Sequence, residues 1–227
     1  MRKKLLKRIA IYALVFFSAY LLIGHLCHRV FFPENKPEVT TYFQPGQQFY
    51  SKSEGFRQIV SKQENGHVHG TLVVEPFAPG PPKHIHSEFD ETFQIENGEL
   101  SVWMDGVVKK IKPGEILHIP KGTPHQPFNE TADTIRLKGT FAFPEKFAYA
   151  LPQVYGVMDN DPEFVKSPKV IFQMALFQDA GFDSYLAEGP PVFIQKTMGF
   201  IVTPMARLAG YKSYYEEYDI QKQLAKK

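Results

Sequence analysis

Two stretches of sequence decide the fold: HIHSEFDETFQIENG at 84–98 and GEILHIPKGTPHQPFN at 114–129. In the first, His84 and His86 are separated by one residue. In an extended chain, side chains two positions apart lie on one face, so both imidazoles point the same way. Glu91 follows five residues after His86, far enough for the chain to bend and return a side chain to that face.

The second stretch supplies one more candidate ligand. His125 lies 34 residues after Glu91 and directly follows a turn rich in proline and glycine. Three neutral imidazoles and one carboxylate suit a borderline first-row ion, so we expect one divalent metal ion, namely Fe, Mn, Ni, Cu or Zn. The predicted ligands are His84, His86, Glu91 and His125.

Around these residues the chain alternates between apolar and polar positions, with turn signals between the runs. The predicted strands are Gly66–Pro76, Thr92–Glu96, Glu99–Met104, Val107–Ile111, Ile116–Ile119 and Thr134–Phe143. Asn97-Gly98 and Asp105-Gly106 are strong hairpin signals. Many short strands with regular turns indicate an all-β core, either a sandwich or a barrel such as a jelly roll.

The same residues resemble the two sequence motifs of the cupin superfamily. The first pattern, H-x-H-x4-E-x6-G, is filled by His84, His86, Glu91 and Gly98. The second, G-x5-P-x-G-x2-H-x3-N, is filled by Gly114, Pro120, Gly122, His125 and Asn129. There is one departure, because the glycine before the first histidine pair is Gly80, closer to His84 than the usual pattern has it.

The resemblance implies a small jelly-roll β-barrel (cupin) with the metal near one mouth and these four side chains as its ligands. Pro120 and Gly122 would shape the turn that presents His125, while Gly98 and Asn129 would be structural. Cupins often pair through their sheets, so the resemblance also implies a homodimer. Cupins catalyse many reactions, and the family therefore does not decide which reaction is catalysed here.

Three other histidines are weaker candidates. His67 and His69 form a second pair that could add a ligand, but a surface-facing strand pair is the better interpretation. His118 alternates with apolar neighbours, and we expect it to face solvent.

Some acidic and apolar residues near the motifs are further candidates. Glu88 and Asp90 could orient the imidazoles through hydrogen bonds, or could simply form a solvated acidic turn. Phe93, Ile95 and Trp103 are candidates for the pocket wall, although ordinary filling of a barrel explains them equally well.

The N-terminal sequence predicts a membrane anchor. Residues 1–29 contain six Lys or Arg and no acidic residue, and residues 9–26 are almost entirely apolar. About 20 helical residues cross the hydrocarbon core, and the preceding cations favour a cytoplasmic N-terminus. A cleaved signal peptide is the alternative, but the apolar run is long and no small-residue cleavage pattern follows it. We therefore expect an uncleaved single-pass anchor, with the cupin domain extracytoplasmic.

Charge and cysteine content exclude some classes of protein. The net charge is +2, but outside residues 1–29 the chain has 20 basic against 24 acidic residues. A nucleic-acid binder needs a basic face, so we expect no nucleic-acid partner. Cys27 is the only cysteine, and an intramolecular disulfide is therefore excluded.

The remainder of the chain divides into a linker and a helical extension. The predicted parts are a tail and transmembrane helix (1–29), a proline-containing linker (30–48), the barrel (49–143) and a helical C-terminal extension (144–227). In the extension, one helix should begin at Ser167-Pro168 and end at Gly181, and another should run from Pro190-Pro191 towards Gly210, with a possible kink at Pro204.

The second of these helices carries an apolar stripe. Its members are Phe193, Phe200, Ile201, Met205 and Leu208. The stripe either packs against the barrel or a second subunit, which is the favoured interpretation, or lies on a membrane surface.

Two functions fit this sequence. The first is a metal-dependent enzyme acting on a small organic molecule, either an oxidoreductase of the dioxygenase type or an isomerase. The second is a non-catalytic small-ligand-binding or sensing module that docks to a membrane partner. An enzyme needs the metal to face a cavity, whereas a module could close the barrel mouth with a C-terminal helix.

Overall fold

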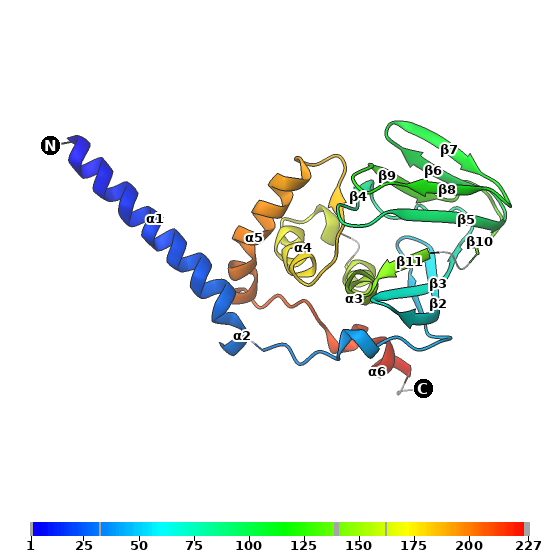
Figure 1. The fold of residues 1–227 in the computed structure, drawn as a ribbon, viewed down its shortest axis with the longest axis horizontal. Coiled ribbons are helices and arrows are strands. Elements are labelled where there is room, and N and C mark those ends of the chain that lie inside the picture. The colour runs from blue at the N-terminus through cyan, green and yellow to red at the C-terminus, as the bar shows by residue number, and fades with distance from the viewer. Residues whose placement is uncertain (1, 32, 139–140, 162, 225–227) are drawn as a thin grey trace.

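The structure is a computed structural model that describes residues 2–31, 33–138, 141–161 and 163–224 (Figure 1). The strands are β1 (Gln48–Ser51), β2 (Phe56–Glu64), β3 (His67–Val74), β4 (His84–Ile85), β5 (Glu91–Asn97), β6 (Leu100–Met104), β7 (Val107–Ile111), β8 (Ile116–Ile119), β9 (His125–Phe128), β10 (Ile135–Leu137), β11 (Phe141–Pro144) and β12 (Tyr185–Leu186). The α-helices are α1 (Arg2–Leu26), α2 (His28–Phe31), α3 (Glu145–Asn160), α4 (Lys169–Asp179), α5 (Val192–Leu208) and α6 (Ile220–Leu224). Short 3-10 helices are η1 (Val39–Thr41), η2 (Phe164–Lys166) and η3 (Glu216–Tyr218).

The strands form two antiparallel sheets with an apolar core between them. One sheet has the order β1-β2-β3-β10-β5-β8, with β11 also paired to β3, and the other has the order β12-β4-β9-β6-β7. Burial alternates along β3, as expected for a strand with one face on a core. The most buried apolar side chains come from both sheets: Val74, Phe93, Leu100, Val102 and Ile135.

Most of the predicted strands are confirmed, but one predicted strand and one predicted hairpin are wrong. β7 and β8 have the predicted bounds, and Asp105-Gly106 forms the predicted hairpin turn, with φ positive at both residues. Asn97-Gly98 does not form a hairpin, because β5 and β6 belong to different sheets. The predicted strand Thr134–Phe143 is instead two strands. Arg136 in β10 pairs with Val73 of β3, whereas β11 pairs with β3 nearer its start, from Gly70. Between these two pairings the numbering advances by five residues from Arg136 to Phe141 but by only three in β3, from Gly70 to Val73. One unbroken ladder of paired residues is therefore impossible.

Helix α3 is an element that the sequence pattern did not predict. Pro152 and Gly156 lie within it, and both disfavour the interior of an isolated helix. The helix forms because residues 147–155 are all buried, and Phe147, Leu151 and Tyr155 among them belong to the apolar core of the barrel. Gly156 is required by packing, since a Cβ there would lie 2.2 Å from the ring of Tyr218.

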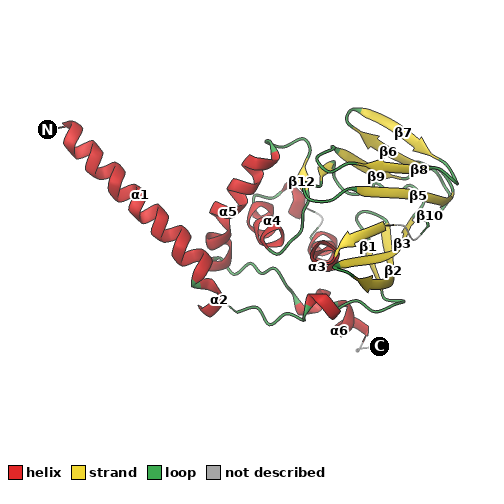
Figure 2. Ribbon diagram, viewed as in Figure 1, coloured by secondary structure: helices red, strands yellow, loops and turns green. Residues whose placement is uncertain are grey.

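The remaining long helices, α4, α5 and α1, lie on the same side of the sheets as α3, with α1 farthest from the sheets (Figure 2). α4 and α5 form as predicted from the two proline-initiated segments and pack on each other. The last turns of α1 pack on α5, where the Tyr20 hydroxyl donates to the Ile201 carbonyl at 2.7 Å. The His25 ring stacks on Phe200 with centroids 4.1 Å apart, and Gly24 lies against Pro204.

One part of the favoured interpretation of the α5 stripe, packing against the barrel, is wrong, whereas packing against a second subunit stays a prediction. Phe193, Phe200, Met205 and Leu208 are at least half exposed, so the stripe does not pack against the barrel. Helix α1 is likewise exposed, and it is long and apolar enough to cross a membrane. Exposed apolar side chains therefore lie on both helices, which are found at one end of the molecule (Figure 1).

Candidate metal centre

Strand pairing brings the predicted ligands together. β4 and β9 are antiparallel neighbours in which His84 lies directly opposite His125. His86 follows β4, where its carbonyl accepts a hydrogen bond from the Gly122 amide at 2.6 Å. Glu91 is the first residue of β5. All four side chains are buried, although their residue types are usually exposed.

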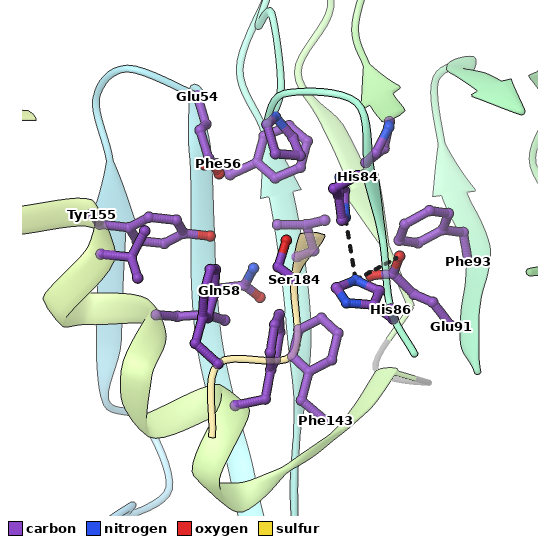
Figure 3. Close-up of a pocket in the computed structure, with 17 residues that line it drawn as sticks. Glu54, Phe56, Gln58, His84, His86, Glu91, Phe93, Phe143, Tyr155 and Ser184 are labelled. Atoms are coloured by element: carbon purple, nitrogen blue, oxygen red, sulfur yellow. Dashed lines mark hydrogen bonds and ion pairs between the residues drawn. The ribbon is translucent and has the colours of Figure 1, made fainter. Parts of the chain in front are cut away.

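The ligand atoms lie close together, and Figure 3 shows three of the four ligands, His84, His86 and Glu91. One ligand atom from each of the four residues lies within 4.8 Å of the others. His84 Nε2 and His86 Nε2 are 3.2 Å apart, and His125 Nε2 lies 2.9 Å from Glu91 Oε2. Atoms bound to one first-row ion at about 2.0–2.2 Å are at most about 4.4 Å apart, so small side-chain movements would suffice to bind one ion.

Backbone carbonyls orient all three imidazoles. Each Nδ1 donates a hydrogen bond: His84 to Pro82 O at 2.8 Å, His86 to Asp183 O at 2.5 Å and His125 to Thr123 O at 2.9 Å. Because Nδ1 carries the proton, the Nε2 lone pairs of His84 and His86 point to the centre, whereas His125 Nε2 donates to the Glu91 carboxylate. The lone pairs of His84 and His86 thus face each other at 3.2 Å, which is repulsive unless a cation lies between them. This donor set fits a divalent metal ion.

Electrostatics keeps two imidazoles neutral and the carboxyl ionised. Burial, reinforced by the neighbouring His86 and His125, holds the pKa of His84 well below its usual value. Burial also lowers the pKa of His86. Burial alone would raise the pKa of Glu91, but its hydrogen bond from His125 and the charges of His125 and His86 outweigh burial and lower it. Burial opposes the charge on His125, yet Glu91 raises the pKa of that imidazole.

Three of the ligands, His84, His86 and Glu91, line a cavity of about 60 Å³, which has room for several water-sized groups. Helix α3 covers the cavity with Phe147, Leu151, Val154 and Tyr155, and therefore narrows the barrel mouth without filling it.

A small polar cluster lies in the cavity wall, across from the imidazoles (Figure 3). Glu54 and Tyr155 are hydrogen-bonded to each other, and both are buried. Burial, with the nearby charge of Asp159, raises the pKa of Glu54 to about 8. Burial beside Glu54 also raises the pKa of Tyr155. The Gln58 side-chain carbonyl Oε1 is buried and has no hydrogen-bond partner among the described residues.

Of the other candidate residues, some line the cavity and others lie away from the metal centre. Phe93 lines the cavity, but Ile95 is buried elsewhere in the core and Trp103 lies beneath the Lys83 ammonium, 4.5 Å from it. His67 and His69 are outside the ligand cluster, as the surface-facing interpretation predicted. His67 is exposed, and His69 lies 3.9 Å from Glu64 on the outer side.

The acidic loop residues do not orient the imidazoles. Glu88 is exposed and pairs with Lys196 at 3.3 Å. Asp90 accepts a hydrogen bond from the Lys121 amide and lies 3.5 Å from His118, which faces solvent as expected. The hypothesis that Glu88 and Asp90 hydrogen-bond to the imidazoles is therefore wrong, because both carboxylates have partners on the surface.

Asp183 orients the His86 imidazole, although the sequence analysis did not identify it as a candidate. Its carbonyl accepts from His86, while its carboxylate accepts the amides of Ser87 and Glu88 at 2.8 and 2.7 Å. Asp183 lies almost 100 residues from His86 in a segment without a motif, so no local signal identified it.

The unusual position of Gly80 also has a structural reason. Its φ is +69°, and a Cβ there would lie 1.8 Å from the Pro127 carbonyl oxygen. The strand that carries His125 therefore passes directly against Gly80, and only glycine leaves room for it.

Comparison with known proteins agrees with this site. Residues 70–141 match the family described as "Cupin domain", so the chain contains a cupin domain with a buried His/His/Glu/His cluster. An oxidoreductase of Pestalotiopsis fici is 48% identical over 48 residues, covering 21% of this chain and 24% of that protein. Quercetin 2,3-dioxygenase of Bacillus subtilis is 33% identical over 73 residues, covering 30% of this chain and 21% of that protein. The chain thus spans about a quarter or less of the length of these relatives.

The solved structures include a cupin-2 domain containing protein from Shewanella frigidimarina. It is 24% identical, with a TM-score of 0.31, and the likeness covers 35% of this chain and 74% of that one.

Proposed function

We propose that this protein is a membrane-anchored metalloenzyme of the oxidoreductase type that acts on a small organic molecule. The observation that carries the proposal is the position of the cavity, which is lined by three of the four proposed ligands, His84, His86 and Glu91. A closed structural site would need no such cavity. The partial likeness to an oxidoreductase and to a dioxygenase supports oxidation over isomerisation.

In this proposal one divalent first-row metal ion is held by the four ligands and supplies Lewis-acid or redox chemistry. The chain's own residues supply the surroundings. Phe147 and Leu151 exclude water from the cavity, which strengthens every polar interaction there. Gln58 Oε1 accepts a hydrogen bond from the bound molecule. Glu54, with a pKa near neutrality, accepts or donates a proton across the cavity.

The membrane placement is part of the same proposal. Helix α1 spans the bilayer with its Lys and Arg residues on the cytoplasmic side, so the barrel lies outside. Since α5 packs on the last turns of α1, its exposed apolar side chains rest on the outer surface of the bilayer. Dimerisation through a sheet stays a prediction.

The test is metal analysis of the detergent-solubilised full chain. We expect about one metal ion per chain, lost in the His86→Ala/His125→Ala variant. The matched control is His67→Ala/His69→Ala, which removes a histidine pair of the same spacing outside the cluster and should leave the metal content unchanged.

Activity is tested next on the metal-loaded chain, by oxygen uptake with quercetin as the first substrate. Uptake that requires His86 and His125 supports an oxidoreductase. A folded parent that takes up no metal after incubation with Fe, Mn, Ni, Cu and Zn salts would refute the metalloenzyme and favour a binding module.

A further inference from the structure

A second, larger cavity adjoins the metal centre. Its volume is about 350 Å³, which lies within the range of about 300 to 1,000 Å³ that small-molecule sites occupy. Helices α3, α4 and α5 and the segment 182–190 supply most of its lining, and Glu54, Pro81, Pro82 and His84 of the barrel supply part of the rest, so it lies between the helical extension and the barrel. We call it the helical chamber.

The helical chamber and the metal cavity share one wall. Six residues line both: Glu54, Pro81, His84, Val154, Phe182 and Ser184. One of them, His84, is a proposed metal ligand. A molecule that fills the helical chamber would therefore extend to the metal centre.

Most of the chamber lining is apolar and adaptable. Met158, Met174 and Met198 come from three different helices, and methionine fits itself to irregular ligands. Ile171, Leu186 and Met198 are about half exposed, so the chamber reaches the molecular surface at these side chains.

The two glutamines in the lining do not make the chamber polar, because their amides already bind the backbone. Gln178 Nε2 donates to the Ser184 carbonyl at 2.9 Å. Gln195 Nε2 donates to the Leu186 and Pro190 carbonyls at 2.9 and 2.7 Å, and its Oε1 accepts from the Leu186 amide at 3.0 Å. A polar ligand would find few partners there and would lose its hydration.

Polar groups are concentrated at the metal end instead. Gln58 Oε1 is a buried acceptor with no partner among the residues that the structure describes, and Glu54 lines both cavities (Figure 3). A buried acceptor of this kind is costly unless a ligand donates to it.

We propose that the helical chamber binds the apolar part of the substrate, and that the substrate is a largely apolar molecule with one hydrogen-bonding end at the metal centre. This inference rests on the proposed function, because it makes the occupant of the chamber the molecule on which the metal centre acts. It goes further by assigning substrate choice to α4 and α5 and not to the barrel.

The experiment measures binding of 2-naphthol, an apolar bicyclic molecule with one hydroxyl donor. The full chain in detergent is titrated calorimetrically, with matched detergent alone as the blank, and the metal content of the same samples is measured. We expect saturable binding at one site per chain.

Two variants narrow the chamber from opposite walls. Gly199→Leu adds a side chain on α5, where a Cβ meets only Gln178 Oε1, at 3.3 Å. Ile171→Phe enlarges a half-exposed residue of α4, a position that tolerates a larger side chain without disturbing the core. Each should weaken 2-naphthol binding by about tenfold or more, equivalent to about 1.4 kcal/mol. The control, Thr197→Leu, adds a similar side chain to the exposed side of α5, away from the chamber lining, and should change nothing.

The outcomes separate the two proposals. Binding that is lost in both narrowing variants and kept in Thr197→Leu supports the helical chamber. This result would support the chamber even if the samples held no metal, an outcome that would contradict only the proposed metalloenzyme. A chain that holds metal but does not bind 2-naphthol overturns the chamber and leaves the metal centre standing. Binding that neither Gly199→Leu nor Ile171→Phe weakens also overturns it, because the ligand must then lie elsewhere.

Discussion

Glu54→Gln should remove a dependence of stability on pH. Glu54 is 6% exposed, and burial beside the charge of Asp159 raises its pKa from the ordinary value of 4.5 to about 8. Glutamine has nearly the same shape and stays neutral at every pH. The variant should therefore retain the fold while losing the titration.

The sign of the effect follows from the proton count. Between pH 4.5 and 8 the folded chain keeps the Glu54 proton whereas the unfolded chain releases it, so stability falls as pH rises through this window. One pKa unit corresponds to about 1.4 kcal/mol. From pH 5 to pH 8, the free energy of unfolding of the parent should thus fall by about 3 to 4 kcal/mol more than that of the Gln variant.

Urea unfolding of the detergent-solubilised full chain measures this difference. Trp103 is the only tryptophan and lies in β6, so its fluorescence reports on the barrel. The measured quantity is the free energy of unfolding of the variant minus that of the parent, at several pH values from 5 to 8. Subtraction cancels all titrating groups that the two chains share.

The control is Glu163→Gln, a replacement of a carboxylate whose side chain is 76% exposed. Its difference from the parent should not change with pH. If the Glu54→Gln difference is equally flat, Glu54 is ionised in the folded protein, and the reasoning from burial is refuted.

Three further predictions concern the anchor, the barrel and the assembly. Leu14→Lys/Phe17→Lys should release the chain from membranes in an alkaline carbonate wash, because each central Lys costs about 3 kcal/mol in a bilayer. In the control, lysines at the exposed positions 107–108 should not release it. Retention of the α1 variant in the membrane would argue against a membrane span. Gly80→Ala should destabilise the barrel by about 3 kcal/mol or more in urea unfolding, since its Cβ would clash with the β9 backbone. Gly66→Ala also has a positive φ but an open surrounding, so it should cost only about 1 kcal/mol, and equal losses would contradict the packing argument. Sedimentation of the detergent-solubilised chain at micromolar concentration should show a dimer, and a monomer would remove that prediction.

The sequence by itself determined the features that short-range chemistry encodes. His84 and His86 share a face because of the two-residue period of an extended chain, and Asp105-Gly106 specifies a hairpin because its turn needs positive φ. Fixed spacings of His, Glu, Gly and Pro identified the cupin motifs, and the run at 9–26 identified an apolar helix. Each of these signals lies within about 20 consecutive residues.

Only the tertiary structure decided the features that depend on contacts between distant segments. Helix α3 forms despite Pro152 and Gly156, because burial against the barrel outweighs its poor propensity. Asp183 reaches His86 across almost 100 residues, and Glu54 changes its pKa because α3 covers it. The helical chamber exists only because α4 and α5 pack beside the metal cavity. Such contacts depend on how the elements pack, and packing is decided by the sum of many small apolar contacts that no local pattern records.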